Sequence, residues 1–309
     1  MAIPVPGRRF WSLLPLLLFC AGISPRVVGD SGDFTYRSSA SEVRLSFSAT
    51  DQNDHGVATL QSSDFAVVDK DVIVRNFQSF TRSDWSKLEI AILVDASGSV
   101  TPRFRQELTE VLNLVSQTSG IPDENLAIFS FQGLKPALLC AGNCQSLATA
   151  ERLLPERSAT GLTPLFDAIL FASEFLGKRG DSHSQRILIL FSDGADTASE
   201  NSLRDTIDDS LRHDLQLDCI DLNPPSRFSS GTGTLQTLAR STGGHYFPAP
   251  DGGAHALQVI LEGFQASYTV SYRLPTRVPG FHSIRILPTH NRNLQFRSRS
   301  GYYYPEQTR

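Results

Sequence analysis

The chain has 309 residues, with 28 Lys and Arg residues against 32 Asp and Glu residues, for a net charge of −4. This length allows two domains, or one large domain with additions. The hydrophobic fraction of 40% supports a sizeable core, and a charged fraction of 19% is too low for a long disordered or coiled-coil protein. The mildly acidic balance argues against a nucleic-acid-binding protein. Four cysteines are too few for a disulfide-rich scaffold.

The first thirty residues have the pattern of an export signal. Arg8 and Arg9 precede the mostly apolar run Phe10–Ala21. We predict a signal peptide over residues 1–29, cleaved after Gly22 or Gly29, with an uncleaved N-terminal anchor as the alternative. No later apolar run reaches the ~18 residues that span a bilayer. We therefore expect an extracytoplasmic protein that is secreted, periplasmic or associated with the cell envelope, and that is not transmembrane after cleavage.

Three cysteines follow the predicted signal peptide. In an oxidising compartment, Cys140 and Cys144 can close a small loop as a disulfide. A zinc site is the alternative, but it lacks a second close pair of cysteines or a nearby histidine. Cys219 lies in the apolar run Leu217–Leu222, and we predict that it is buried.

The region from residue 30 to residue 86 alternates with a period of two. Apolar residues from Val43 to Ala49 fall on one face of a predicted strand. Phe65–Val68 and Val72–Val74 flank a polar Asp-Lys-Asp turn, which indicates a hairpin. We predict the first part of a β domain here.

The region from residue 87 to residue 266 has a different pattern of apolar residues. Near-continuous apolar strands alternate with helical segments, which predicts a mostly parallel, doubly wound (Rossmann-like) sheet with helices on both faces. The predicted strands are Leu88–Val94, Leu126–Phe131, Ile187–Phe191, Leu217–Leu222 and His245–Phe247. The predicted helices are Phe104–Val115, Leu165–Leu176, Leu203–Leu211, Leu235–Ala239 and Leu257–Phe264.

Residues 267–309 return to the alternating pattern. They hold seven arginines against one glutamate, whereas residues 181–221 hold ten acidic residues and three arginines. We interpret both charged blocks as solvated surface. Because the two alternating regions are each too short for a stable sandwich, we predict that both chain ends build one smaller β-sandwich-like domain. The α/β domain of residues 87–266 is then inserted into it.

The strongest chemical signal follows the first α/β strand. Leu88–Val94 runs into Asp95-Ala96-Ser97-Gly98-Ser99, and alternate residues of an extended segment point the same way. Asp95, Ser97 and Ser99 can therefore converge on one point. All three offer oxygen, which suits Mg²⁺ or Mn²⁺ better than zinc.

Two further segments end at the same predicted edge of the sheet. Thr163 precedes Pro164 and is placed to supply the hydroxyl that starts a helix. Asp193 follows the strand Ile187–Phe191, and it would lie beside Asp95 if the two strands are neighbours. Open α/β sheets bind ligands outside the carboxyl ends of their strands.

These motifs together resemble the von Willebrand factor type A domain with its metal-ion-dependent adhesion site. The matching segments are Asp95-x-Ser97-x-Ser99, Gly161-x-Thr163-Pro-Leu and Phe191-Ser192-Asp193-Gly194. The flanking segments Leu60–Phe65, Phe77–Phe80 and Arg299–Tyr302 resemble the VWFA-related family of Acidobacteria-type secreted proteins. The whole resemblance covers about residues 40–305.

The resemblance implies a role for each motif residue. Ser97, Ser99 and Thr163 would bind one divalent cation, Mg²⁺ or Mn²⁺ with Ca²⁺ as an alternative. Asp95 and Asp193 would hold coordinated waters. The remaining position would take an Asp or Glu carboxylate from a partner protein. Thr160 competes with Thr163, because Leu162 stands where the family usually has a second glycine.

We therefore predict an exported, non-enzymatic binding module for cation-dependent adhesion or protein–protein interaction. A metal-dependent hydrolase or phosphatase is one alternative. Ser97 stands where such phosphatases need a second acid, and His245 is the histidine that this layout allows near the sheet edge. A structural envelope protein without functional metal binding is the other alternative.

Overall fold

The structure is a computed structural model that describes residues 42–53, 55–83, 87–97, 123–133, 135–142, 144, 162–181, 183–223, 229–248, 253–290 and 293–304. Several predictions concern residues outside these ranges. They are the signal peptide over residues 1–29 and its cleavage points, the helix Phe104–Val115, and the candidate ligands Ser99 and Thr160.

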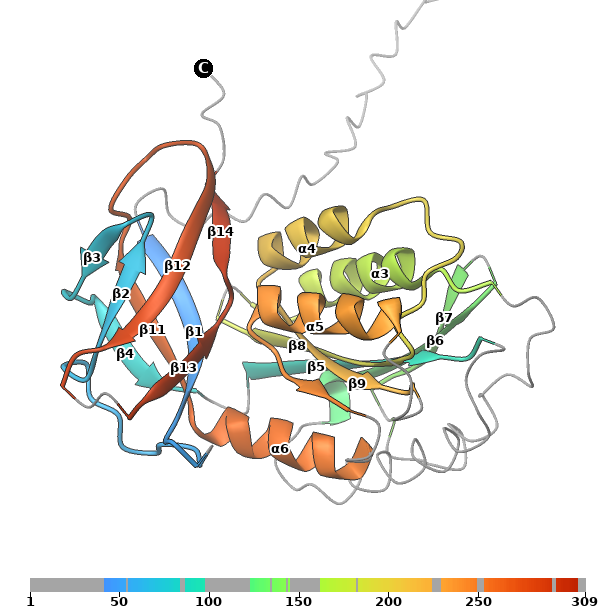
Figure 1. Cartoon of the computed structure of the whole chain (residues 1–309), viewed down its shortest axis with the longest axis horizontal. Helices are drawn as coiled ribbons and strands as arrows, with labels where there is room; N and C mark the ends of the chain where they lie inside the picture. The colour runs from blue at the N-terminus through green and yellow to red at the C-terminus, as the bar shows by residue number, and fades with distance from the viewer. Residues whose placement is uncertain are drawn as a thin grey trace, which may run out of the picture. The chain divides into compact units, whose positions relative to one another are not determined.

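A mostly parallel central sheet forms the middle of the described chain (Figure 1). Neighbouring strands pair in parallel except for the last, which runs antiparallel. β5 is buried along its whole length because helices cover both faces of the sheet. In the described residues, the strand order is β10 (Tyr246–Phe247), β9 (Leu215–Asp221), β8 (Gln185–Ser192), β5 (Leu88–Asp95), β6 (Leu126–Gln132) and β7 (Lys135–Ala141).

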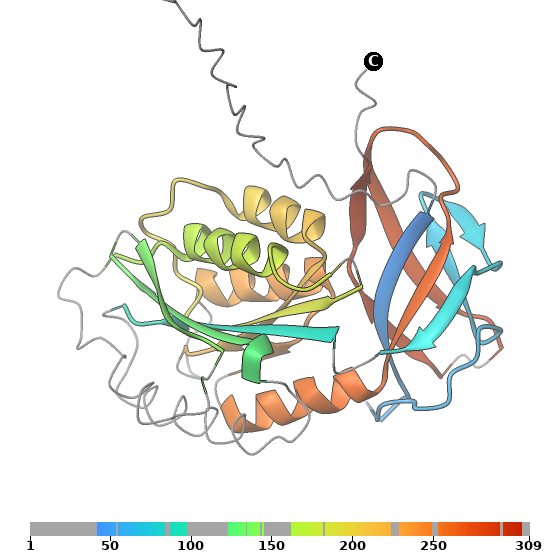
Figure 2. The same cartoon turned by 180° about the vertical axis from the view of Figure 1, so that it is seen from behind.

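The helices that the structure describes lie on both faces of this sheet. α3 (Leu165–Gly177), α4 (Leu203–Arg212) and α5 (Ser230–Thr242) pack on one face, and α6 (Gly253–Gln265) packs on the other. Figure 2 shows α6 leading directly into the next strand of the chain. The doubly wound α/β prediction is therefore confirmed, and most of the described helices and strands of this domain lie within a few residues of their predicted bounds.

Two elements differ from the sequence prediction. β7 was not predicted, because Pro136 and the exposed Ala137 and Leu138 give no buried pattern, and a proline in a strand favours an edge position of this kind. α5 begins at Ser230, earlier than predicted, because its first turn contains glycine and threonine rather than apolar residues. Ser229 Oγ accepts the Thr232 N–H at 3.2 Å and caps this turn.

The chain ends form two antiparallel sheets that pack face to face. β1 pairs with β11, and β2 pairs with β12, so each sheet joins strands from both sides of the α/β domain. As far as the chain is described, one sheet has the order β13 (Gln295–Ser298), β1 (Glu42–Thr50), β11 (Ser267–Arg273), β4 (Ser79–Arg82). The other has the order β14 (Gly301–Tyr304), β12 (Gly280–Pro288), β2 (Phe65–Asp69), β3 (Val72–Val74). The predicted insertion is thereby confirmed.

Alternating burial explains why these sheets pack. β1 alternates intermediate and buried residues along its length, and Phe47 from this strand lies with its ring centroid 5.0 Å from that of Phe65 on the other sheet. The predicted hairpin between β2 and β3 is also present. Lys70 and Asp71 have φ values of 45° and 68°, which are left-handed conformations typical of a tight hairpin turn.

Residues of the two charged blocks meet where the β domain contacts the α/β domain, so the prediction that both blocks are solvated surface is wrong for Arg299 and Asp214. Arg299 Nη1 lies 2.6 Å from Asp214 Oδ1, and Tyr303 Oη donates to Asp208 Oδ1 at 2.6 Å. Arg212 lies over the ring of Tyr303, 4.9 Å from its centroid. Opposite charges therefore join the two domains.

Candidate metal centre

Asp95 is the last residue of β5 and is fully buried. Its Oδ1 accepts the Ser97 N–H at 2.9 Å, and its Oδ2 accepts the Ser192 hydroxyl at 2.8 Å. Because β5 and β8 are neighbours, the hydroxyl at the end of β8 reaches the carboxylate at the end of β5. Both carboxylate oxygens of Asp95 are thus held in fixed directions.

The environment of Asp95 favours a nearby positive charge. Burial raises the pKa of this carboxyl from 3.8 to about 6, although hydrogen bonds from Ser97 and Ser192 oppose the rise. The negative charge of Asp193 raises the pKa of Asp95 further. A divalent cation beside these two carboxylates would relieve the cost of holding them ionised together, so the residues present fit the implied cation.

The loop after β8 holds Asp193 next to Asp95. Gly194 N donates to Ser192 Oγ at 3.0 Å, and Ala195 N donates to Asp193 Oδ1 at 3.0 Å. Gly194 has a φ of 75°, and a Cβ there would lie 2.2 Å from Gly231 O in α5. The loop therefore depends on glycine for both its conformation and its close contact with α5. The predicted adjacency of the two aspartates rests on the pairing of β5 with β8.

Thr163 lies at the same edge of the sheet. Gly133, just after β6, donates its N–H to Leu162 O at 3.1 Å. Thr163 N donates to Thr197 Oγ1 at 2.8 Å, and Thr197 N donates to Thr163 O at 2.9 Å. These bonds fix the buried Thr163 between the end of β6 and the loop that follows β8.

The prediction that Thr163 starts α3 with its hydroxyl is wrong. The N-cap of α3 is Pro164, without a side-chain cap. Ser199 instead accepts the N–H groups of Phe166 and Asp167 through its Oγ, at 3.0 and 3.2 Å. The sequence did not reveal this cap, because Ser199 is 33 residues from Phe166 along the chain. The Thr163 hydroxyl is therefore not engaged in capping.

Asp95, Ser97, Thr163 and Asp193 thus lie at the carboxyl-terminal edge of the sheet, and all of their side chains bear oxygen. Such ligands suit Mg²⁺ or Mn²⁺. Within the described part of the chain, no group of three or more His, Cys, Asp and Glu side chains is arranged as a metal cluster. Cys140 and Cys144 form a disulfide, and Cys219 is a buried free thiol, as predicted. The zinc alternative therefore has no support from Cys140 and Cys144.

His245 is engaged elsewhere. Its Nδ1 lies 3.0 Å from Asp218 Oδ1, and its backbone N–H donates to the same oxygen at 2.6 Å. Asp218 stands three residues before the carboxyl end of β9. His245 is thus paired with a carboxylate in the middle of a strand.

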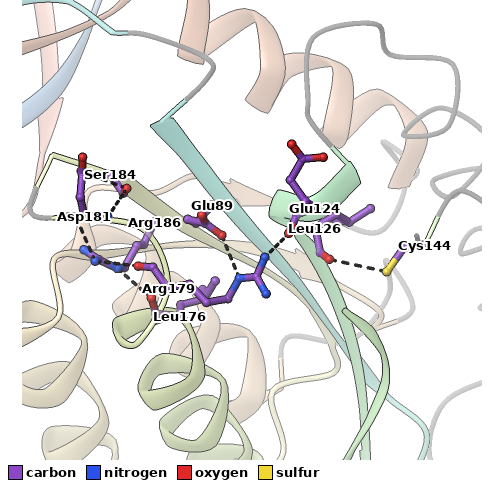
Figure 3. Close-up of polar contacts among 9 residues, drawn as sticks. All are labelled: Glu89, Glu124, Leu126, Cys144, Leu176, Arg179, Asp181, Ser184 and Arg186. Carbon is purple, nitrogen blue, oxygen red and sulfur yellow. Dashed lines mark hydrogen bonds and ion pairs between the residues drawn. The ribbon is translucent and has the colours of Figure 1, made fainter. Parts of the chain in front are cut away.

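The opposite edge of the sheet is tied together by buried ionic groups (Figure 3). Arg179 Nε donates to Glu89 Oε2 at 2.9 Å, near the amino-terminal end of β5. Arg186, near the start of β8, donates through Nε to Leu176 O at 2.9 Å and so satisfies a carbonyl at the end of α3. Glu89 and Arg186 are each 6% exposed. We interpret this edge as structural, because these charges satisfy groups within the fold.

Residues 90–195 match the family model of the von Willebrand factor type A domain. The matched segment begins in β5 and ends just after the Ser192-Asp193-Gly194 loop, so it contains β6, β7, α3 and β8 and the candidate ligands, whereas β9 and β10 follow it. The central α/β domain is therefore a von Willebrand factor type A domain, as the motifs predict. The narrower resemblance of the flanking segments to the VWFA-related family stays a prediction.

Comparison with solved structures gives several matches at low sequence identity. An aerotolerance-related membrane protein from Bacteroides fragilis is 15% identical, with a TM-score of 0.43, over 57% of this chain and 98% of that chain. The manganese-loaded TRAP protein of Plasmodium vivax is 16% identical, with a TM-score of 0.45, over 74% of this chain and 98% of that chain. The SpRpn10 VWA domain is 16% identical, with a TM-score of 0.40, over 55% and 93%. No curated protein matches the chain.

Von Willebrand factor type A domains often mediate protein–protein interactions, and they often bind a divalent metal ion. They are typically interaction modules rather than enzymes. Of the helices that the structure describes, none is long and apolar enough to cross a membrane.

Proposed function

We propose that this chain is an exported, non-enzymatic binding module for cation-dependent adhesion or protein–protein interaction. Asp95, Ser97, Ser99, Thr163 and Asp193 hold one Mg²⁺ or Mn²⁺, and Thr163 rather than Thr160 supplies the threonine ligand. The observation that carries the proposal is the gathering of Asp95 and Asp193 beside the hydroxyl-bearing Ser97 and Thr163. Two buried or partly buried carboxylates at one sheet edge need a positive charge.

The chemistry of this set indicates what kind of partner it takes. Two carboxylates formally balance a divalent cation, but neutral hydroxyls donate weakly to it. The cation therefore stays attractive to a further anionic oxygen. An Asp or Glu carboxylate on the surface of a partner protein supplies such an oxygen, and its binding then depends on the cation.

Export is part of the proposal. The disulfide between Cys140 and Cys144 supports an oxidising compartment, because such bonds rarely persist in a reducing cytosol. Residues 1–29 act as the signal peptide, with the β domain over residues 30–86 and 267–309 and the binding domain over residues 87–266. Mass measurement of the exported protein tests this directly, since cleavage after Gly22 or Gly29 gives two distinct masses.

Calorimetric titration with Mg²⁺ and Mn²⁺ tests the cation site. The purified protein should give saturable binding, and Thr163→Val should weaken it at least tenfold because it removes a hydroxyl at nearly constant shape. Thr163→Ser keeps the hydroxyl and is the matched control. Folded protein that gives no saturable binding at millimolar cation would refute the site.

Pull-down from envelope extract with Mg²⁺, repeated with EDTA, tests partner binding. Loss of the captured protein in EDTA and in the Thr163→Val variant supports the proposal, and capture that survives both contradicts it.

A phosphatase and esterase panel addresses the hydrolase alternative. The engagement of His245 with Asp218 speaks against that alternative, because it occupies the histidine considered as a base for Ser97.

A further inference from the structure

Asp221, the last residue of β9, is a buried carboxylate that the sequence motifs do not include. Its Oδ2 accepts the hydroxyls of Thr232 at 2.8 Å and Tyr246 at 2.7 Å. Its Oδ1 accepts the backbone N–H and the side-chain Nδ2 of Asn223, at 2.8 and 2.7 Å. Asp221 is therefore a fixed point that joins the end of β9 to α5 and β10.

Asn223 connects this fixed point to the candidate metal centre. Besides its bond to Asp221, its Nδ2 donates to the backbone oxygen of Asp193 at 2.7 Å. A second hydrogen bond joins the same two segments, because Leu222 N donates to Ser192 O at 3.0 Å. The loop that carries Asp193 is thus held from the side of β9 as well as from its own strand.

The packing on this side leaves the loop little freedom. A Cβ at Gly231 would lie 2.1 Å from Asp193 O, the same oxygen that Asn223 binds. The α5 backbone therefore lies directly against this carbonyl. The bond from Asn223 and the contact from Gly231 together set where the Asp193 main chain lies.

We infer that Asn223, held by Asp221, is a positioning residue that fixes the Asp193 loop and so sets the cation affinity of the site; this rests on the proposed function. Neither residue is assigned as a ligand of the cation. Both act through the main chain of Asp193, in the way that partners of a metal ligand commonly act. Loss of such a partner commonly lowers metal affinity by about 10- to 100-fold.

A purely structural role for Asn223 makes a different prediction. In that case its loss would lower stability without changing the loop or the cation affinity. Gln216 of β9 offers a matched control, because its Nε2 donates to the buried Asp218 at 2.8 Å, away from the carboxyl-terminal edge. Asn223→Ala and Gln216→Ala each remove one side-chain amide that binds a buried carboxylate on β9.

The experiment measures two properties of both variants and the unmodified protein. The first is amide hydrogen exchange at Gly194 and Ala195 in EDTA, which reports on the metal-free loop. The second is Mn²⁺ affinity by calorimetry. We expect Asn223→Ala to speed exchange at both amides at least tenfold and to weaken Mn²⁺ binding about tenfold. We expect Gln216→Ala to change neither.

Tyr246→Phe is the second variant if Asn223→Ala does not fold. It removes one donor to Asp221 without touching Asn223, and we expect smaller changes in the same direction. The inference is overturned if the amides of Gly194 and Ala195 exchange as slowly in the variants as in the unmodified protein. It is also overturned if they exchange faster while the Mn²⁺ affinity is unchanged. Faster exchange in a protein that never binds Mn²⁺ overturns the proposed function and upholds the positioning of the loop.

Discussion

Asp69 of β2 and His282 of β12 lie together in the centre of the β domain, fully buried, with Nδ1 3.4 Å from Oδ1. Tyr272 and Tyr302 also donate their hydroxyls to Asp69 Oδ2, at 3.0 and 2.8 Å. Burial and the negative charge of Asp69 raise the pKa of both tyrosines, so both stay neutral donors. One carboxylate thus joins four strands: β2 from the part of the chain before the α/β domain, and β11, β12 and β14 from the part after it.

We expect Asp69→Ala to lower the free energy of unfolding by about 3 kcal/mol, because the buried Tyr272 and His282 and the partly buried Tyr302 lose their acceptor. Tyr272→Phe removes a single donor and should cost about 1 kcal/mol. Urea unfolding followed by circular dichroism measures both. A cost below about 1 kcal/mol for Asp69→Ala would contradict this account of the cluster.

The raised pKa of Asp95 predicts a pH dependence of the metal-free protein. Its pKa of about 6 in the folded protein exceeds its ordinary pKa of 3.8, so the folded state binds this proton more tightly than the unfolded state does. Ionisation of Asp95 in the folded protein therefore lowers the free energy of unfolding. This loss is absent below about pH 4 and complete above about pH 7, where it amounts to about 3 kcal/mol. In EDTA, stability from this group should therefore fall as the pH rises from 4 to 7.

Unfolding in urea at pH 5 and pH 7 checks this dependence, with Asp95→Asn as the comparison. The variant carries no titrating group at this position, so the difference between the two pH values should shrink. Mn²⁺ affinity should also fall about tenfold per pH unit below pH 6, because the cation then competes with a proton. Equal pH profiles for the two proteins would contradict the assignment to Asp95.

The ion pair between Arg299 and Asp214 predicts energetic coupling between the two domains. The side chains are 10% and 20% exposed, so water screens the pair weakly. We expect a double-mutant cycle with Arg299→Ala and Asp214→Asn to give a coupling energy of about 2 kcal/mol. Asparagine suits this position because Asp214 has a φ of 53°, a conformation that asparagine tolerates. Additive effects of the two changes would show that the pair contributes nothing beyond its separate residues.

Two glycines in the first turns of α5 offer a test of the contact between α5 and the Asp193 loop. A Cβ at Gly231 would lie 2.1 Å from Asp193 O, whereas a Cβ at Gly233 would meet nothing within 4 Å. We expect Gly231→Ala to displace the loop, weaken Mn²⁺ binding at least tenfold and lower stability. Gly233→Ala should raise stability by about 0.5–1 kcal/mol and leave Mn²⁺ binding unchanged. Calorimetry and thermal unfolding measure both effects, and equal Mn²⁺ affinities in the two variants would contradict the contact.

The order of the α/β elements could be predicted from the sequence, because burial on both faces of a sheet imposes near-continuous apolar strands such as Leu88–Asp95. The hairpin between β2 and β3 could be predicted for a similar reason, since its turn residues and flanking apolar runs are adjacent in the chain. The motif that contains Asp95, Ser97, Thr163 and Asp193 was recognisable because each segment follows a strand or precedes a helix. Patterns of this kind depend on neighbours within a few residues.

The tertiary structure decided the contacts between distant segments. Ser199 rather than Thr163 caps α3, Asn223 holds the Asp193 loop, and Arg299 meets Asp214 instead of solvent. Each of these bonds joins residues 30 or more positions apart, and a single hydroxyl, amide or charge gives no periodic signal along the chain. Their partners are set by how helices and sheets pack, because packing alone brings such groups within hydrogen-bonding distance.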